Sequence, residues 1–307
     1  MSVNRSVSVL ARLLDLAKSR GDDYNLLLNS FALERLLCRL SVSGHSHSFL
    51  LKGALLFRLW YDQPHRPTRD ADLLGYGPND AGHLIATFGD IAAIDLDDGI
   101  VFDVDSIRVE SIREDNFYGG MRVRLIGRIG SARCPLRIDV GFGDAVTPEA
   151  PTVAYPALLQ GFSSPTLRVY PAYTVIAEKY QAMVMLGLAN SRMKDFYDLV
   201  TIAARTELDG ATLARAIAAT FDRRKTALPD EPPIALQREF GDDIAKRRQW
   251  QAFLDKNRLE APCLTEVIGR IYILLWPATQ VARSNSAANA MWSPGLGQWI
   301  SHPQRPH

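Results

Sequence analysis

Hydrophobic residues recur at helical spacing along the start of the chain. One apolar stripe runs through residues 9–17 and a second through residues 26–40, with the spacing of three and four that is typical of an amphipathic helix. The polar run 21–23, which begins with a glycine, separates the two stripes. The pattern predicts two helices in a segment 1–45 that packs on the domain behind it.

The pattern then switches between two periods. Short apolar runs at 48–51 and 71–75 predict strands, and each is followed by an amphipathic run that predicts a helix. Apolar and polar residues alternate through much of 100–140, as they do in half-buried strands. We therefore predict that residues 46–150 form an α/β (α+β) core with a mixed sheet.

Helical spacing returns in the second half of the chain. Residues 172–276 contain a series of amphipathic runs, so they are predicted to form an all-helical C-terminal domain. The preceding stretch 151–171 is rich in proline and glycine and is interpreted as a linker. Residues 277–307 are rich in small and polar residues, and we predict that this tail is poorly ordered.

Composition narrows the class of protein. The formal net charge is +1 over 307 residues, so a positive field for nucleic acid would have to be local. No apolar run approaches the roughly 20 residues of a membrane span, and the N-terminus lacks a secretory pattern. Cys38, Cys134 and Cys263 are few and odd in number, which argues against a disulfide framework. The expected location is the cytoplasm, without a membrane partner.

Two carboxylates one residue apart are the strongest chemical feature. Asp70 and Asp72 lie at i and i+2 of a predicted strand, so their side chains point to the same face. Two like charges at one point are tolerated when a cation lies between them. Mg²⁺ held by carboxylates and by the phosphates of a substrate satisfies this condition, and the pair therefore indicates phosphoryl or nucleotidyl transfer.

A third carboxylate completes the predicted metal site. Asp139 lies between two apolar residues of a predicted strand, where a mixed sheet could bring it beside Asp70 and Asp72. Three such ligands could hold two metal ions about 3.5–4 Å apart, an arrangement that clamps the attacking and leaving oxygens of a displacement. Alternatively, Asp139 is a cross-strand partner of Arg137 or Arg124.

Residues near the first strand extend this site. Gly53 permits a tight turn and a close approach of phosphate to backbone N–H groups. Lys52 and Arg69 flank the site, either to neutralise phosphate or as ordinary surface cations. Three more arginines share one strand face: Arg122, Arg124 and Arg128. They are candidates for binding the backbone of a polynucleotide. Alternatively, they form ion pairs with Glu110, Glu114 and Asp115.

Two charged residues are out of place in the predicted helices. Lys179 interrupts an apolar stripe, so its ammonium either reaches water along its own stem or meets an anion such as nucleotide phosphate. Asp195 opens the next helix and is either a base for the attacking hydroxyl or a partner of Lys179. Asp195 and Asp198 are expected on the side away from the core, with Lys194 and Asp198 as an i,i+4 pair.

Three segments together resemble one family. They are Leu51-Lys52-Gly53-Ala54-Leu55 with Arg66-Pro67-Thr68-Arg69-Asp70-Ala71-Asp72-Leu73, then Ile176-Ala177-Glu178-Lys179-Tyr180-Gln181-Ala182, and Arg192-Met193-Lys194-Asp195-Phe196-Tyr197-Asp198-Leu199. In this order and spacing they resemble the motifs of the AbiEii/AbiGii toxins, nucleotidyltransferase-like proteins of type IV toxin–antitoxin and phage-defence systems. The similarity extends over about residues 5–275.

The resemblance implies a polymerase-β-like nucleotidyltransferase core with a helical C-terminal half. It implies that Mg²⁺ is the cofactor and that an NTP supplies a nucleoside monophosphate to an RNA acceptor, the tRNA 3′ end in relatives, which inhibits growth. A cognate antitoxin is the expected partner. By this resemblance Asp70 and Asp72 bind metal, Lys179 contacts the triphosphate and Asp195 completes the active site.

One position departs from the family pattern. The nucleotidyltransferase turn usually contains Gly-Ser or Gly-Gly, whereas this chain has Gly53-Ala54. The residues also allow two other functions: a non-catalytic module that binds nucleotide or a partner, and nucleotidyl transfer to a small molecule or a protein. A non-catalytic module has no reason to keep two carboxylates that repel each other.

Overall fold

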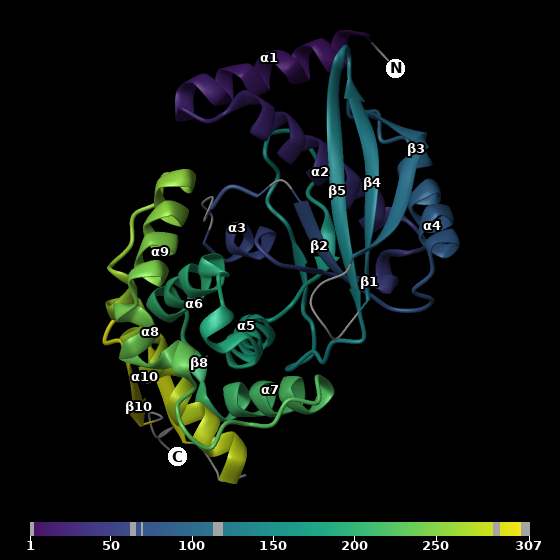
Figure 1. Ribbon diagram of the computed structural model, residues 1–307. Coiled ribbons are helices and arrows are strands. Elements are labelled where there is room, and N and C mark those ends of the chain that lie inside the picture. Colours follow the sequence, from purple (N-terminus) through teal and green to yellow (C-terminus); the bar gives the residue numbers. More distant parts are fainter. Residues whose placement is uncertain (1–2, 62–65, 69, 113–118, 285–288, 302–307) are drawn as a thin grey trace, which may run out of the picture. The chain divides into compact units, whose positions relative to one another are not determined.

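The chain forms two compact units. The computed structural model describes residues 3–61, 66–68, 70–112, 119–284 and 289–301 (Figure 1). Unit 1 comprises Met1–Gly143 and Ala150–Tyr170, and unit 2 comprises Asp144–Glu149 and Pro171–His307. None of the described helices combines the length and the apolar character that a membrane crossing requires.

A five-stranded mixed sheet is the centre of unit 1. Its strand order is β1-β2-β5-β4-β3, and its strands are β1 (Phe49–Lys52), β2 (Asp70–Gly75), β3 (Val101–Ile112), β4 (Gly120–Ile129) and β5 (Ala132–Phe142). The β2–β5 pair is parallel, and the other neighbours are antiparallel. The predicted mixed-sheet α/β core is confirmed.

Helices cover one face of this sheet. They are α1 (Val3–Arg20), α2 (Tyr24–Val42), the short 3-10 helix η1 (Ser46–Ser48), α3 (Leu55–Tyr61) and α4 (Ala81–Ala93). The main contacts are those of α2 with β5 and of α4 with β3 (Figure 1). The side chains of Asp23 and Asp80 cap α2 and α4. Because strand residues alternate, Val123, Ile138 and Val140 are buried under these helices while their neighbours in sequence point to the other face.

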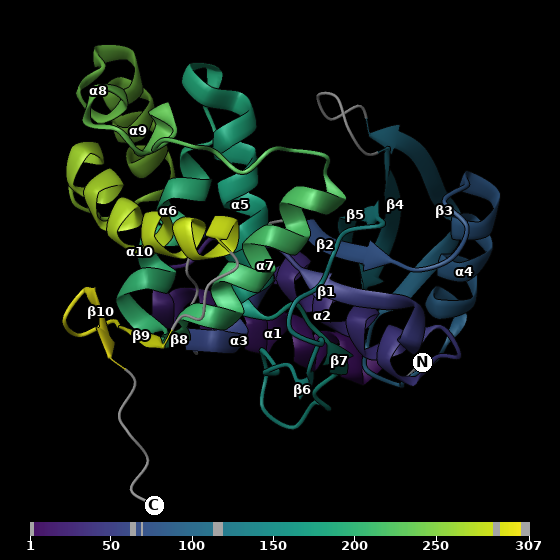
Figure 2. The same ribbon diagram turned by 90° about the horizontal axis from the view of Figure 1, so that it is seen from below.

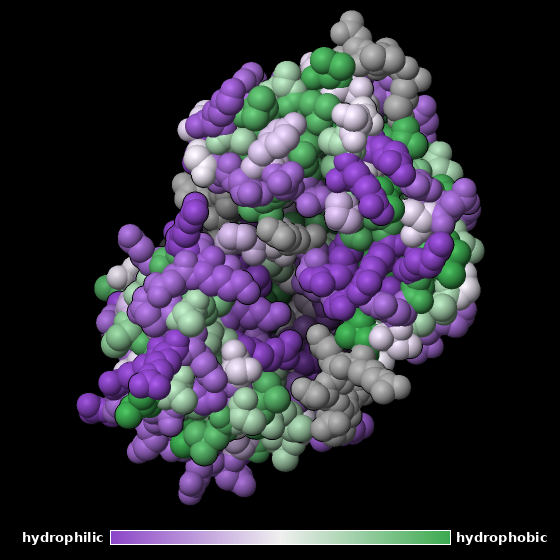
Figure 3. All heavy atoms as spheres, turned by 45° about the horizontal axis from the view of Figure 1, so that its top comes forward, coloured by the Kyte–Doolittle hydropathy of each residue, from purple (hydrophilic) through white to green (hydrophobic). Residues whose placement is uncertain are grey.

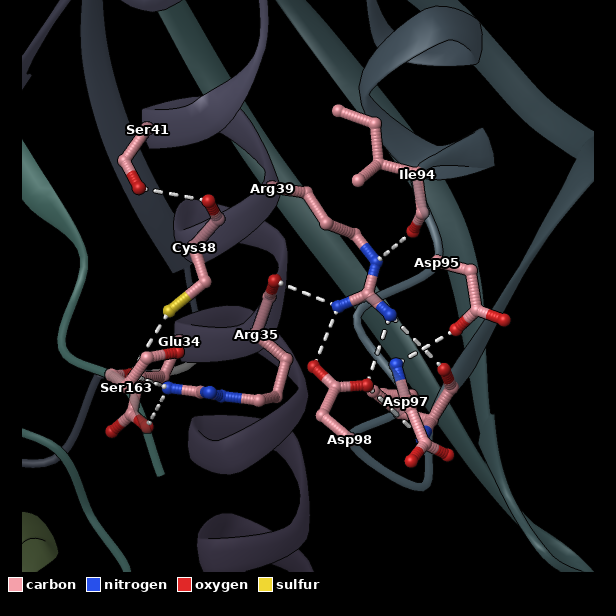
Figure 4. A network of polar contacts seen from close by, with 11 residues as sticks. Glu34, Arg35, Cys38, Arg39, Ser41, Ile94, Asp95, Asp97, Asp98 and Ser163 are labelled. Atoms are coloured by element: carbon pink, nitrogen blue, oxygen red, sulfur yellow. Dashed lines mark hydrogen bonds and ion pairs between the residues drawn. The ribbon is translucent and has the colours of Figure 1, made fainter. Parts of the chain in front are cut away.

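A buried ion pair joins α2 to the loop before β3. Arg39 and Asp98 are almost fully buried, and the guanidinium donates two hydrogen bonds of 2.8 and 2.9 Å to the carboxylate (Figure 4). Its remaining N–H groups bond the carbonyls of Ile94, Arg35 and Ile100. All five donors are used, so the cost of burying this charge is offset by its hydrogen bonds.

The predicted linker is part of unit 1. It contains β6 (Thr152–Ala154) and β7 (Thr166–Arg168), which pair with each other. Glu34 accepts a 2.6 Å hydrogen bond from the Leu158 amide, and Arg35 donates one to the Ser163 carbonyl. Burial raises the pKa of Glu34, and attraction to Arg35 opposes this effect. The linker prediction was wrong because these contacts involve buried polar groups of α2, which proline and glycine content does not reveal.

Unit 2 is mainly helical. Its helices are α5 (Ala172–Leu186), α6 (Met193–Arg205), α7 (Gly210–Arg223), α8 (Arg238–Asp242), α9 (Ile244–Asn257) and α10 (Leu264–Ser284), with 3-10 helices η2 (Gly187–Ala189) and η3 (Ile234–Leu236). Helix α10 packs mainly on α7, α6 and α8. The predicted helical half is present, and three short strands add to it: β8 (Leu208–Asp209), β9 (Ala290–Ser293) and β10 (Gln298–Ser301).

The described part of the tail is ordered, contrary to the prediction. Helix α10 continues through Pro277 to Ser284, and β9 and β10 form a sheet with β8 (Figure 2). Trp292 is buried and donates a 2.7 Å hydrogen bond to the Ala203 carbonyl. Its ring lies 5.5 Å from that of Trp299. Two tryptophans bury enough apolar area to order a segment of small residues.

Trp299 also compensates for the proline inside α10. Pro277 has no N–H, so the carbonyl of Ile273, four residues earlier, loses its helical donor. The indole N–H of Trp299 lies 3.1 Å from this carbonyl and 3.2 Å from that of Leu274. The tail therefore supplies a hydrogen bond that the helix cannot make itself.

This compensation predicts coupling between two distant positions. Trp299→Phe should lower the free energy of unfolding by about 1 kcal/mol, because the Ile273 carbonyl loses its donor. Pro277→Ala restores a backbone N–H, so Trp299→Phe should cost less in that background. Urea unfolding of the four proteins measures the coupling. Trp292→Phe, which removes the bond to Ala203, is the matched control and should show no coupling to Pro277→Ala.

Candidate active site

The parallel pairing of β2 and β5 brings the predicted carboxylates together. In this register Asp72 is opposite Asp139, and Asp70 is opposite Arg137. Neighbouring strands lie about 4.8 Å apart and register partners point to the same face. Lys52 of β1 is the partner of Asp72 on the other side. The three carboxylates therefore share one face of the sheet, opposite the face that α2 and α4 cover.

Arginines on the same face engage two of these carboxylates. Arg122 of β4 donates from Nε and Nη2 to the two oxygens of Asp139, both at 2.8 Å. This hydrogen bonding raises the pKa of Arg122. Arg137 forms an ion pair with Asp70. The side chains of Asp139 and Asp70 are 21% and 26% exposed, so both carboxylates are reachable from solvent.

The partner of Asp139 differs from the alternatives considered above. The sequence suggested Arg137 or Arg124, whereas the antiparallel register places Arg122 directly opposite Asp139. Strand alternation alone puts all three arginines on one face, and the register decides which of them reaches Asp139. The prediction that Asp139 lies beside Asp70 and Asp72 is consistent with the sheet order.

The donor set fits a hard cation. Within the described residues, no group of three or more histidine, cysteine or carboxylate side chains is already arranged around a common point as metal ligands are. Carboxylate oxygens are nevertheless the donors that Mg²⁺ prefers, and three of them come from adjacent strands on one face. The roles of Asp70, Asp72 and Asp139 as metal ligands stay predictions.

Gly53 fits closely against Asp72. Its φ of +76° is one that L side chains rarely adopt, and an added Cβ would lie 1.9 Å from Oδ2 of Asp72. Glycine is therefore required here by the turn and by the carboxylate together. The sequence predicted the tight turn, and contact of its N–H groups with phosphate stays a prediction. Ala54 follows the turn and is buried.

Of the two cations predicted to flank the site, the structure describes Lys52 but not Arg69. The ammonium of Lys52 lies 5.4 Å from the ring centroid of Tyr170, which is fully buried. Such a cation–π contact restrains the Lys52 ammonium near Tyr170, while the backbone of Lys52 is paired with Asp72. Arg69 lies outside the described residues.

Lys179 of α5 meets two carboxylates of α6 in unit 2. Its Nζ lies 2.7 Å from Oδ1 of Asp195 and 2.7 Å from Oδ2 of Asp198. Burial lowers the pKa of Lys179, but attraction to the two carboxylates outweighs this and raises it. The cation is therefore present at neutral pH, and its contribution to stability is lost only as pH rises through the raised pKa.

The sequence placed Asp195 and Asp198 on the wrong side of their helix. Both are buried, with side chains 6% and 1% exposed, because Lys179 provides a buried counter-charge. Asp195 holds Lys179, as one of the two alternatives proposed, and Arg192 lies 3.4 Å from its second oxygen. The role of Asp198 as a partner of Lys179 was missed, although its spacing of three from Asp195 puts both on one helix face.

A second ion-pair cluster in unit 2 was also missed. Arg224 lies 2.9 Å from Asp144 and 3.3 Å from Glu178, and it donates to Gln181 at 3.0 Å. Asp144 belongs to the short segment that joins unit 2 ahead of α5. No local pattern indicates this cluster, because Asp144 and Arg224 are distant in the sequence from each other and from the α5 residues.

Comparison with known proteins gives the family of this chain. The family model for the nucleotidyl transferase AbiEii toxin of type IV toxin–antitoxin systems matches residues 35–268. This range is more than half of the chain. The chain therefore belongs to the AbiEii nucleotidyl transferase toxin family, and the resemblance seen in its three motifs is confirmed.

Two solved structures from Helicobacter pylori are similar to this chain. JHP933 is 13% identical, has a TM-score of 0.48, and the match covers 86% of this chain and 95% of JHP933. The second, described as a candidate nucleotidyltransferase, is 14% identical with a TM-score of 0.46, and covers 87% of this chain and 100% of its own. No curated protein matches this chain.

The contact between Gly53 and Asp72 predicts a position-specific effect. Gly53→Ala should lower the free energy of unfolding by more than the roughly 1–2 kcal/mol of a left-handed conformation, because the methyl group displaces the Asp72 carboxylate. Gly161→Ala is the matched control, since Gly161 has φ +79° and open space around the added Cβ. Thermal unfolding of both variants measures the difference. Equal losses would contradict the contact.

The contacts of Lys179 predict that removal of this cation alone strongly lowers the free energy of unfolding. Lys179→Met leaves two buried carboxylates without it and should cost about 3–5 kcal/mol, and Lys179→Met with Asp198→Asn should recover part of this loss. Lys246→Met is the control: Lys246 is also buried, but it donates to the Asn190 carbonyl. Denaturant unfolding compares the variants, and a control loss as large as that of Lys179→Met would argue against the carboxylate effect.

Proposed function

We propose that the chain is a Mg²⁺-dependent nucleotidyltransferase toxin that transfers a nucleoside monophosphate from an NTP to an RNA acceptor, the tRNA 3′ end. The observation that carries this proposal is the set of three carboxylates on adjacent strands. Asp70, Asp72 and Asp139 share a face, and the Asp72 carboxylate occupies the space that a side chain at position 53 would need. Membership of the AbiEii family supports the reaction class and the toxin role.

The residues of unit 1 have distinct tasks in this reaction. Asp70, Asp72 and Asp139 would hold Mg²⁺, which when bound neutralises phosphate charge and orients the α-phosphate. Arg122 and Arg137 pair with Asp139 and Asp70 and limit their movement, so the proposed ligands are placed before substrate arrives. Lys52 adds positive charge beside Asp72.

The proposed reaction is a single displacement at phosphorus. The acceptor hydroxyl oxygen forms a bond to the α-phosphorus, the bond from this phosphorus to the α–β bridging oxygen breaks, and pyrophosphate leaves with the electron pair. A carboxylate of the site takes up the hydroxyl proton. Positioning and charge supply most of the catalysis in such transfers.

Lys179 is proposed to contact the triphosphate. An ammonium has three N–H donors, and Asp195 and Asp198 accept two of them. The carboxylates fix the direction of the third donor, which would bond a phosphate oxygen. This role makes Asp195 a positioning residue rather than a general base.

Growth inhibition and its control follow from the family. Modification of the tRNA 3′ end would block aminoacylation, and a cognate antitoxin would oppose this effect. The antitoxin partner is a property of type IV toxin–antitoxin systems, to which the family belongs.

Label transfer tests the function directly. Each of the four α-³²P-labelled NTPs is incubated with Mg²⁺ and total RNA, and in parallel with total protein. Label should enter RNA of tRNA size from at least one NTP and should depend on Mg²⁺. Asp70→Asn and Asp72→Asn should each reduce transfer by about 100-fold or more, since each removes a charge that stabilises the transition state.

The control is Asp105→Asn, which changes an exposed carboxylate of β3 and should transfer label at the rate of the unmodified protein. Equal labelling by the Asp105→Asn and Asp72→Asn variants would contradict the assignment of Asp72 to the active site. Label in protein but not in RNA would favour the alternative acceptor. Stabilisation by NTP without Mg²⁺, with no transfer at all, would favour a binding module.

A further inference from the structure

Three arginines lie side by side across the sheet, starting beside Asp70. Arg137 of β5 is the register partner of Asp70, Arg124 of β4 is opposite Arg137, and Arg108 of β3 is opposite Arg124. All three point to the face that carries the predicted metal ligands. At one strand spacing each, the arginines span about 10 Å.

Such a row is unfavourable for the fold itself. Like charges directly opposite each other on neighbouring strands destabilise a sheet. Carboxylates and carbonyls offset part of this cost: Arg137 pairs with Asp70, Arg124 lies 2.6 Å from Glu110, and Arg108 donates to the carbonyls of Asp105 and Ile107. A row of three arginines is thus costly to keep and is explained by an anionic ligand.

The basic positions extend further than one nucleotide. Arg128 and Arg133 are opposite each other on β4 and β5, four residues along β4 from Arg124. This separation is about 14 Å at the rise of a strand. Arg128 pairs with Asp103 at 3.4 Å, and Arg133 is exposed. A triphosphate is too short to reach both groups, whereas a polynucleotide presents a phosphate at every step.

The surface is also of the kind that binds a backbone rather than a small molecule. The side chains of Arg124 and Arg128 are 55% and 53% exposed, and small molecules favour enclosed apolar pockets. On the side of the molecule in Figure 3, hydrophilic residues predominate and hydrophobic ones occur in small groups. Each guanidinium has five donors in a planar fork that matches phosphate.

We infer that the face of β3, β4 and β5 formed by Arg108, Arg124, Arg128 and Arg133 binds the sugar-phosphate backbone of the RNA acceptor and leads its end toward Asp70. We name this surface the arginine face. The inference rests on the proposed function, since it identifies the surface that presents the acceptor to that site. It requires a local positive field and not a high net charge, in agreement with the formal +1 of the whole chain.

RNA binding measured without NTP tests the arginine face independently of catalysis. Fluorescence anisotropy follows labelled bulk tRNA over a range of KCl concentrations. The triple variant Arg124→Gln/Arg128→Gln/Arg133→Gln should weaken binding about 10-fold or more at low salt. The slope of log K against log salt should fall by about two to three, since each phosphate contact contributes about 0.7–0.9.

The matched control removes the same charge elsewhere. Arg238→Gln/Arg270→Gln/Arg283→Gln breaks three ion pairs of unit 2, with Asp242, Glu266 and Asp230, and should change binding by less than about 2-fold. If the first triple variant unfolds, the single reversal Arg133→Glu, at an exposed position, replaces it. Equal weakening by both triple variants, or none by the first, would overturn the inference.

The labelling assay separates this inference from the proposed function. Label transfer to RNA together with normal RNA binding by the arginine-face variant would retain the function and reject the surface. Conversely, RNA binding could be lost only in the arginine-face variant while the unmodified protein transfers no label. That result would retain the surface and reject the function. Tight binding of DNA duplex but not of tRNA would overturn the choice of RNA.

Discussion

The parallel pairing of β2 with β5 is the constraint on which the candidate site depends. It aligns Asp72 with Asp139 and Asp70 with Arg137, residues that are distant in the sequence. Its register is fixed by the core, because Ala71, Leu73, Ile138 and Val140 alternate with the charged residues and are buried. A slip of one residue would turn the carboxylates into the core and the apolar side chains into solvent. The hydrophobic core therefore sets the geometry of the charges.

The same principle of compensation is used in both units. In unit 1, Arg122 and Arg137 accompany Asp139 and Asp70. In unit 2, the ammonium of Lys179 donates hydrogen bonds to both Asp195 and Asp198. Each arrangement places a cation within hydrogen-bonding distance of a carboxylate, so that neighbouring negative charges are compensated.

Sequence periodicity predicted most of the fold and part of the candidate site. The α-helices of unit 1, the strands of its five-stranded sheet and the common face of Asp70 and Asp72 follow from local spacing, because periods of 3.6 and 2 are properties of single elements. Two kinds of feature did not follow. The partner of Asp139 depends on strand register, and the burial of Asp198 depends on Lys179 in another helix. The order of 290–301 depends on tryptophan contacts with helices far earlier in the chain. Composition cannot report such contacts.

The bond from Trp299 to Ile273 has a consequence for the order of folding. Helices normally form from local contacts within about a microsecond, and each carbonyl finds its donor four residues later. The carbonyl of Ile273 instead depends on an indole 26 residues further along the chain. During synthesis the central turn of α10 therefore stays incompletely bonded until β10 has emerged. The last hydrogen bond of the helix around Pro277 is therefore made by the last strand that the structure describes.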